Sequence, residues 1–216
     1  MAAMPALRRL ALVLGAALLA AGCSGSGYSY LANKNEKLYF KVPDSWTVFE
    51  TNDMTKTTGM SAAGTWVRGF AAGAKPTIGT VLSITSRQPR GYVEVVKLDP
   101  TERDALSIAT LRGTNFGSDS TGNPIDPIDF VQKNPSGPLQ ILAYDDGVVL
   151  PAGPHGVHIR VAISDTNGEA IIDQTVLVDK ATTKRYVLSI GCNPACWAAN
   201  QRQIKEVIKS WTLEAK

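Results

Sequence analysis

Two cysteines near the end of the chain stand at a spacing that suits a short disulfide. Cys192 and Cys196 are separated by Asn193-Pro194-Ala195, where an expected strand ends and an expected helix begins. At such a junction the Cα atoms can lie within the window of about 4.4–6.8 Å that a disulfide requires. The alternative is a redox thiol, because a helix N-terminus lowers the pKa of a thiol. The C-x3-C spacing differs from the C-x2-C of thioredoxin-like sites and favours a structural disulfide.

The histidines and acids do not form a metal-binding pattern. His155 and His158 lie three apart on an expected strand and therefore point to opposite faces, unless His155 belongs to the preceding turn. No third ligand accompanies them, so we expect no metal and no cofactor. Asp145-Asp146-Gly147 lacks the spacing of a calcium loop and is interpreted as a turn between strands.

Motifs for nucleophilic or phosphate chemistry are also missing. The chain has no G-x-S-x-G sequence, and Gly69 to Lys75 has the wrong spacing for a phosphate-binding loop. The four tryptophans can form a ligand-stacking set, but core packing is favoured because two of them fall on the apolar stripe of the last helix; they are Trp46, Trp66, Trp197 and Trp211. We expect no enzyme, and the alternative is an envelope hydrolase with dispersed catalytic residues.

The polar face of an expected hairpin is the candidate binding face. Strands near 156–164 and 170–179 flank the turn signal Asn167-Gly168. A two-residue turn there pairs Ala162 with Asp173 and Arg160 with Thr175. The candidate residues are then on one face, and they are His158, Arg160, Asp173 and Thr175. The other interpretation is a solvated sheet face with a diagonal pair between Arg160 and Asp173.

The elements that hold these residues indicate an α+β fold, an antiparallel sheet flanked by helices. Strands are expected near 38–42, 65–71, 91–98, 139–149, 156–164, 170–179 and 185–191. One helix is expected from Pro100 to about Arg112, after the cap Asp99. A second begins at Asn193-Pro194 with an apolar stripe of Trp197, Ile204, Ile208 and Trp211. The sequence does not decide the secondary structure of residues 51–64 and 75–86. Residues 113–138 form a long connection that is rich in Gly, Ser, Asn and Pro.

The N-terminal segment predicts the location of the protein. Arg8 and Arg9 precede an apolar run from Leu10 to Ala21, which is too short to cross a bilayer and ends in Gly22-Cys23. This segment resembles a bacterial lipoprotein signal peptide (residues 1–22), after which Cys23 is lipidated; an ordinary signal peptide with a chance Cys23 is the alternative. Residues 23–34 would then form the lipidated tether, and 35–216 a single globular domain, on the extracytoplasmic face of the membrane.

Charge and composition restrict the partners. Loss of residues 1–22 removes two cations and no acid, so the net charge falls from +3 to +1. With no block of lysine or arginine, nucleic acid is not an expected partner. The expected partners are the membrane, through the anchor, and an envelope lipid or membrane protein. We expect a monomer.

Two segments resemble a known class of domain. Val42-Pro43-Asp44-Ser45-Trp46 is similar to the V-P-x-x-W entry of PsbP-like and Mog-like domains. The block from Cys192 to Ser210-Trp211-Thr212 is similar to actinobacterial lipoproteins of the LpqN/LpqT type. The resemblance covers about 40 residues and implies an α-β-α sandwich with a non-catalytic binding or accessory role.

These observations lead to one hypothesis about the site. The last helix is expected to close the sheet face that carries Ile159, Val161, Ile172 and Val176. The segment 113–138 is expected to fold over the opposite, polar face and bind a partner there without bond-making chemistry.

Overall fold

The computed structural model describes residues 27–58, 64–166 and 168–214, so Cys23 and the predicted leader lie outside the described residues. Within these ranges the chain forms a seven-stranded sheet in the order β3-β4-β5-β9-β8-β7-β6 and a three-stranded sheet in the order β1-β2-β10. The strands are β1 Tyr28–Asn33, β2 Leu38–Pro43, β3 Thr47–Phe49, β4 Trp66–Ala71, β5 Arg90–Lys97, β6 Leu139–Val149, β7 His155–Asp165, β8 Gly168–Val178, β9 Lys184–Cys192 and β10 Thr212–Leu213.

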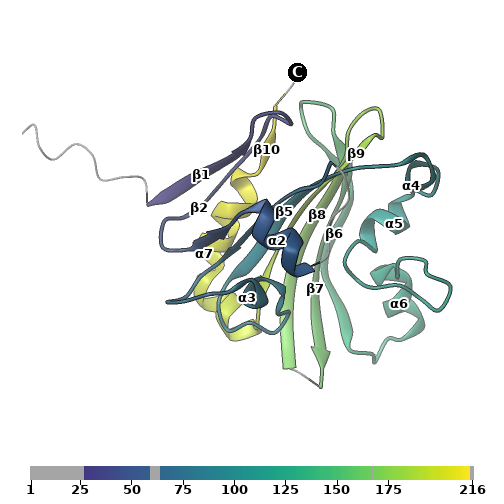
Figure 1. Cartoon of the computed structure of the whole chain (residues 1–216). Coiled ribbons are helices and arrows are strands. Elements are labelled where there is room, and N and C mark those ends of the chain that lie inside the picture. Colours follow the sequence, from purple (N-terminus) through teal and green to yellow (C-terminus); the bar gives the residue numbers. More distant parts are fainter. Residues whose placement is uncertain (1–26, 59–63, 167, 215–216) are drawn as a thin grey trace, which may run out of the picture.

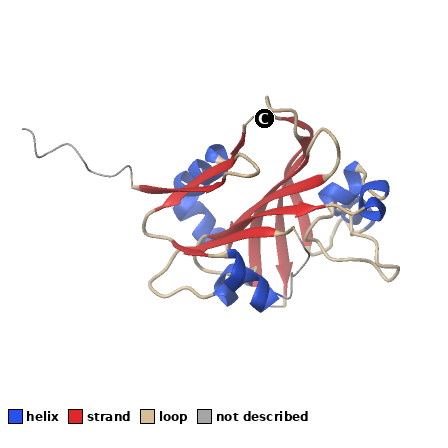
Figure 2. Ribbon diagram, turned by 45° about the horizontal axis from the view of Figure 1, so that its top comes forward, coloured by secondary structure: helices blue, strands red, loops and turns tan. Residues whose placement is uncertain are grey.

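All neighbouring strands pair antiparallel, and helices cover both faces of the large sheet (Figures 1 and 2). The helices are α2 Thr51–Thr58, α3 Ile78–Leu82, α4 Pro100–Asp104, α5 Ile108–Arg112, α6 Pro127–Lys133 and α7 Pro194–Ser210. The predicted fold class, α+β with an antiparallel sheet flanked by helices, is therefore confirmed. Tyr28–Asn33, which the sequence placed in the tether, form strand β1.

The largest core cluster lies between α7, the small sheet and one face of the large sheet. Apolar side chains from β2, β5, β9 and α7 meet there, and Phe70 stacks on Trp46 with ring centroids 5.9 Å apart. Gly91 makes room for this ring, because a Cβ at position 91 would lie 2.7 Å from Phe70. The core interpretation of the tryptophans holds for Trp46, Trp197 and Trp211, and the half-buried Trp66 packs against the same cluster.

The opposite face of the large sheet is covered at two ends. Met54 of α2 and Val81 of α3 pack on β4 at one end. At the other end, the segment from α5 to α6 covers β6, β7 and β8, and Phe116, Ile128 and Phe130 pack against the cluster that contains Ile159. Between them Leu98 and Leu111 pack on valines of β7, β8 and β9, and the same face carries the buried polar residues Glu94 and Gln174.

The assignment of the two faces was wrong in the sequence-based hypothesis. Helix α7 covers the face that carries Asp173, and the segment 113–138 covers the face of Ile159, Val161 and Ile172. The reason is the pairing of the central strands. Asp173 lies opposite Ile190 of β9 and shares its face, and Ile190 packs against the helix. Strands β8 and β9 are buried on both sides, so both of their faces carry apolar residues. A row of apolar residues therefore could not show which face of the sheet α7 covers.

The hairpin register also differs from the prediction by two residues. Asp165 pairs with Gly168, so Arg160 lies directly opposite Asp173 and His158 opposite Thr175. Gly168 therefore begins β8 and does not occupy the turn. A shift of two residues keeps every side chain on its predicted face, because the strand period is two.

The single helix predicted over 100–112 is two short helices. Asp99 caps α4 in a capping box with Glu102, as predicted, but the helix ends at Asp104. Ser107 then caps α5 in a second box with Thr110. Serine and threonine side chains hydrogen-bond to nearby backbone groups and so compete with the hydrogen bonds of a continuous helix. A second capping box directly after the first therefore favours the start of a new helix.

Two other segments are more ordered than the sequence suggested. The connection 113–138 contains α6, which Asp126 caps, and an antiparallel bridge between Ser118 and Pro124. Asp145-Asp146-Gly147 do not form a turn between strands. They lie inside β6 at a β-bulge, where the Gly147 N–H donates to the Asp145 carboxylate at 2.8 Å. A second bulge lies between Ile141 and Ala143.

Candidate functional site

The predicted binding face is a charged cluster built around the buried Asp173, beneath α7. Asp173 is 1% exposed, and its two carboxylate oxygens have different partners. His158 Nε2 lies 3.0 Å from Oδ1, and Arg160 donates from Nε to Oδ2 at 2.7 Å. The Arg160 guanidinium lies 5.3 Å from the centre of the Trp197 ring. The four predicted residues are thus brought together, with Asp173 and Thr175 both buried.

A shallow groove of about 420 Å³ is what remains open beside this cluster. Its lining residues are Asp145, Val148, His158, Arg160, Thr175, Lys205, Ile208 and Lys209. The segment 113–138 does not reach it, because that segment lies on the other face of the sheet. The predicted combination of loop and polar face is therefore not formed.

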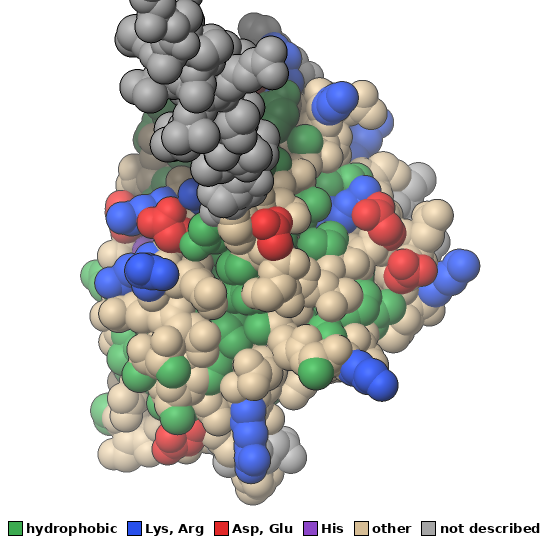
Figure 3. Space-filling model, turned by 90° about the vertical axis from the view of Figure 1, so that its left-hand side faces the viewer, with side chains coloured by type: hydrophobic (Ala, Val, Ile, Leu, Met, Phe, Trp, Pro, Cys, Tyr) green, Lys and Arg blue, Asp and Glu red, His purple; other side chains and the backbone are tan. Residues whose placement is uncertain are grey.

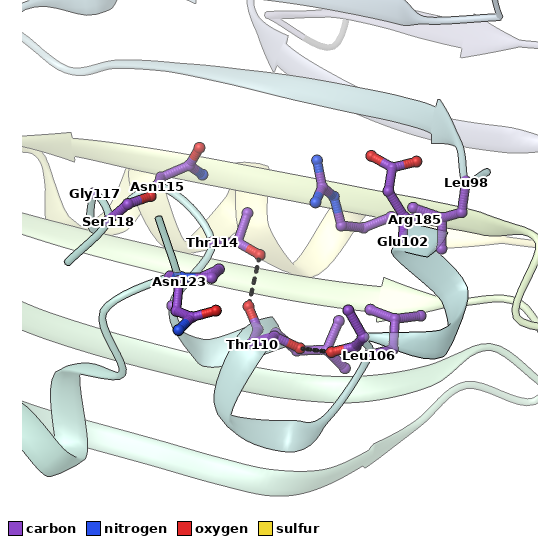
Figure 4. A pocket seen from close by; sticks show the side chains of 14 residues that line it. Leu98, Glu102, Leu106, Thr110, Thr114, Asn115, Gly117, Ser118, Asn123 and Arg185 are labelled. Atoms are coloured by element: carbon purple, nitrogen blue, oxygen red, sulfur yellow. Dashed lines mark hydrogen bonds between the residues drawn. The ribbon is translucent and has the colours of Figure 1, made fainter. Parts of the chain in front are cut away.

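A larger cleft, of about 490 Å³, lies on the opposite face beneath the segment that follows α5. Its lining residues are Leu98, Glu102, Ala105, Leu106, Thr110, Leu111, Gly113, Thr114, Asn115, Gly117, Ser118, Asn123, Pro124 and Arg185. Figure 4 shows Arg185, Glu102 and Leu98 at one end of the cleft and Asn115, Gly117 and Ser118 at the other. Thr110, Thr114 and Asn123 lie between them.

The amide end of the cleft is held by one glutamine of the sheet. Gln174 of β8 is fully buried, and its Nε2 donates to the backbone carbonyl of Thr114 at 2.7 Å. Its Oε1 accepts from Nδ2 of Asn115 at 2.6 Å. Asn115 has a φ of 69°, a left-handed conformation that asparagine tolerates better than most residues. Gln174 thus fixes both the backbone and the side chain of the cleft wall.

The segment is fastened again behind the cleft. Arg112, the last residue of α5, donates from Nε to Asp126 at 3.0 Å and from Nη1 to Asp146 of β6 at 2.7 Å. Asp126 also accepts from the backbone N–H of Ile128 and so begins α6. The pKa of Arg112 is raised, chiefly by the hydrogen bond that Arg112 donates to Asp126 and further by the charges of Asp126 and Asp146. The segment 113–126 is therefore clamped at both ends.

The charged end of the cleft carries one guanidinium near two carboxylates. Arg185 Nη2 lies 3.9 Å from the carboxylate of Glu94, and its buried Nε donates to no group among the described residues. Burial raises the pKa of Glu94, and the charge of Arg185 opposes this rise. Glu102 lines the cleft while its Oε2 accepts the backbone N–H of Asp99. This end of the cleft thus combines the Arg185 guanidinium, whose Nε–H is unpaired among the described residues, with the carboxylates of Glu94 and Glu102.

The remaining predicted site residues take structural roles. Cys192 and Cys196 form a disulfide with Cα atoms 6.0 Å apart, which joins the end of β9 to the first turn of α7. His155 is exposed at the start of β7. The part of the chain that the structure describes holds no cluster of three or more metal-ligating side chains.

The residues that build the cleft were missed by sequence reasoning. Gln174 had one visible signal, since it is an amide in the largely apolar run from Ala170 to Val178. Asn115 and Asn123 lay in a stretch that the sequence marked only as rich in turn formers. The partner of Asn115 and of the Thr114 carbonyl is Gln174, about 60 residues away along the chain, so no local pattern could connect them.

In the described residues, no helix combines the length and the apolar character needed to cross a membrane. Comparison of the sequence with protein families and with curated proteins gives no match.

Solved structures of similar fold exist at low sequence identity. CyanoP, the PsbP protein of Synechocystis sp. PCC 6803, is 11% identical with a TM-score of 0.49, covering 89% of this chain and 96% of its own. The Ran-binding protein Mog1p of Saccharomyces cerevisiae is 10% identical with a TM-score of 0.43, covering 87% and 96%. LpqN of Mycobacterium tuberculosis, involved in cell envelope biogenesis, is 13% identical with a TM-score of 0.41, covering 88% and 87%. These likenesses concern the fold, and we transfer no function from them.

Proposed function

We propose that this protein is a lipoprotein, anchored through Cys23 on the extracytoplasmic face of the membrane, that binds an uncharged, hydroxyl-rich envelope component in the cleft. The binding involves no bond-making chemistry. The anchor is supported by the apolar run from Leu10 to Ala21 and by the Gly22-Cys23 junction. The binding site is supported by the geometry of the cleft.

The observation that carries the binding site is the pair of hydrogen bonds from Gln174. Through them the Asn115 amide and the Thr114 backbone are fixed before any ligand arrives. A preorganised polar wall lowers the entropy that binding costs. The volume of about 490 Å³ lies within the range of roughly 300–1,000 Å³ that small-ligand sites occupy.

The lining favours a ligand with many hydroxyl groups. Hydroxyls and amides, which both donate and accept hydrogen bonds, come from Thr110, Thr114, Ser118, Asn115 and Asn123. Leucine and proline side chains provide apolar contacts between them. A saccharide alternates hydroxyl groups with C–H faces and matches both kinds of contact.

The charged end favours a ligand without net charge. Arg185 faces the Glu94 carboxylate, so an anion would compete with an internal partner. A cation would meet the same guanidinium. A hydroxyl group can donate to Glu102 without disturbing the pair formed by Arg185 and Glu94.

The rival function is an envelope hydrolase. Hydrolysis of a glycoside commonly uses two carboxylates that flank the scissile bond. Glu94 has the raised pKa of a general acid but does not line the cleft, and Glu102 is engaged in the cap of α4. The His158–Asp173 pair lies on the other face of the sheet. Binding without turnover is therefore the better-supported function.

The anchor is tested in the native host by Cys23→Ser. We expect wild-type protein in the detergent phase with an acylated N-terminal peptide, and the variant either released or left with its leader uncut. An unmodified wild-type N-terminal peptide with unchanged partitioning of the variant would refute the anchor.

The binding site is tested by NMR titration of the folded domain with maltotriose, cellotriose and N,N′-diacetylchitobiose. At least one saccharide should shift the side-chain amide signals of Asn115 and Asn123. Asn115→Gly keeps the left-handed backbone and removes the amide, so it should weaken this binding at least tenfold. Asn35→Gly, in the exposed turn after β1, is the matched control. If none of the saccharides moves the Asn115 and Asn123 signals, the proposed ligand class is wrong. Cleavage of a saccharide that Glu94→Gln abolishes would establish the hydrolase instead.

A further inference from the structure

Three tyrosines gather on the outer face of the small sheet. In the register of β1 and β2, Tyr30 pairs with Lys41, and Tyr28 and Tyr39 fall on the same side of the pleat as this pair. The alternate residues of β2, Leu38, Phe40 and Val42, point inward and are buried in the main core. We call the side that carries Tyr28, Tyr30 and Tyr39 the tyrosine face.

Tyr30 is the most exposed large hydrophobic side chain in the described part of the protein, with 75% of its surface accessible. Lys41 lies 4.6 Å from the centre of the Tyr28 ring and forms an ion pair with Glu206 of α7 at 3.2 Å. The small sheet therefore presents an aromatic ring to the outside, while the charge of its strand β2, Lys41, is paired with α7. Figure 3 shows the side of the molecule toward which β1 projects, where hydrophobic surface lies between scattered cations and acids.

The position of this face relative to Cys23 limits what can cover it. Four residues lie between Cys23 and Tyr28, and the five residue-to-residue steps from Cys23 to Tyr28 span at most about 18 Å when fully extended. A lipid on Cys23 would therefore hold β1 within that distance of the bilayer surface. Tyrosine is enriched at membrane–water interfaces, where the ring lies among the acyl chains and the hydroxyl group reaches the headgroups.

We propose that the tyrosine face lies against the headgroup layer of the membrane, with Tyr30 inserted at the interface. This inference rests on the proposed lipid anchor. This contact would fix the orientation of the anchored domain. A covalent tether at one point leaves the domain free to rotate about that point, whereas an additional contact at β1 prevents the rotation. Helices α4 and α5, which contribute to the lining of the cleft, lie on the side of the molecule away from β1 (Figure 1). The cleft then lies on the side of the domain away from the lipid.

The test uses the lipidated full-length mature protein in vesicles of phosphatidylcholine and phosphatidylglycerol. Cys23 is acylated and Cys192 is bonded to Cys196, so a single new cysteine can carry a nitroxide label. Ala32→Cys places the label on the tyrosine face, beside Tyr30, with all three rings retained. Gln132→Cys places it on the exposed side of α6 as the distant control.

Electron paramagnetic resonance then compares collisions of the label with oxygen, which concentrates in lipid, and with a water-soluble nickel chelate. We expect the ratio of oxygen to nickel accessibility to be several-fold higher at position 32 than at position 132. Adding Tyr30→Ser to the Ala32→Cys protein should lower the ratio toward the control.

Equal ratios at positions 32 and 132, in protein whose acylation mass spectrometry has verified, would overturn the orientation and leave the anchor intact. Absence of the acyl group would overturn both. An unchanged ratio after Tyr30→Ser would show that the tether alone sets the distance and would also overturn the role of Tyr30.

Discussion

The side chain of Gln174 donates to the backbone carbonyl of Thr114 across 2.7 Å, although the two residues lie 60 positions apart. This bond connects the middle of the large sheet to the segment that forms the cleft wall. Replacement by Gln174→Leu would leave a buried carbonyl without its donor, at a cost of about 1–3 kcal/mol in the free energy of unfolding. Urea denaturation measures the cost. Gln201→Leu, on the exposed side of α7, should change stability by less than about 0.5 kcal/mol. Equal effects would contradict the role of Gln174.

The buried carboxylate of Glu94 predicts a pH dependence of stability. Burial raises its pKa above the ordinary value of 4.5, so between these two pKa values the folded protein binds more protons than the unfolded chain. Stability should therefore fall as the pH rises from about 4.5 through the raised pKa, by about 1.4 kcal/mol for each unit of difference. Glu94→Gln removes this slope. The measurement is a series of urea unfolding curves between pH 4.5 and pH 8, with the exposed Glu169→Gln as control. A slope that persists in Glu94→Gln would assign the effect to another group.

Two isoleucines of α7 should differ in their contribution to stability. Ile204 is fully buried in the main core, whereas Ile208 is half-buried at the edge of the groove. Ile204→Ala should cost about 2–5 kcal/mol through lost burial and the cavity it leaves. Ile208→Ala should cost clearly less. Thermal or urea unfolding of the two variants checks this, and the reverse order would mean that the helix is rotated about its axis.

The disulfide of α7 should stabilise the fold without being required for it. Its ring contains five residues, and closing a ring of this size contributes roughly 2 kcal/mol on the chain-entropy account. Cys192→Ala combined with Cys196→Ala should lower the melting temperature and leave the circular dichroism spectrum folded. Two free thiols in protein exported by its native host would show that the bridge is absent in the cell.

Much of the fold was accessible from the sequence because its signals are local. The four strands from Leu139 to Cys192 follow alternating or continuous apolar runs, and two caps of the form Asp or Asn followed by Pro mark the starts of α4 and α7. The two cysteines could be paired because they are separated by one tight turn. The break at Ser107 was also a local signal, since Ser107 and Thr110 form a capping box.

The cleft, and the question of which face of the sheet α7 covers, depend on contacts between residues far apart in the sequence. Local sequence signals therefore could not predict them. The sequence shows that Ile159 and Arg160 point to opposite sides, but not which side α7 covers. That choice depends on the register between β8 and β9, where Asp173 lies beside Ile190. Arg185 likewise meets Glu94 only because β5 and β9 are neighbours in the sheet.

The two bulges of β6 have a consequence for a protein confined to a surface. β6 is one of the two edge strands of the large sheet, and a straight edge strand offers its backbone groups to any strand that approaches. Anchored copies move in two dimensions and meet more often than copies dispersed through a volume. The interruptions after Ile141 and Asp145 make the edge an irregular template, because a bulge bends the strand and breaks the even spacing of donors and acceptors. If the protein is anchored as proposed, crowding along the membrane would therefore not readily lead to its polymerisation through the sheet.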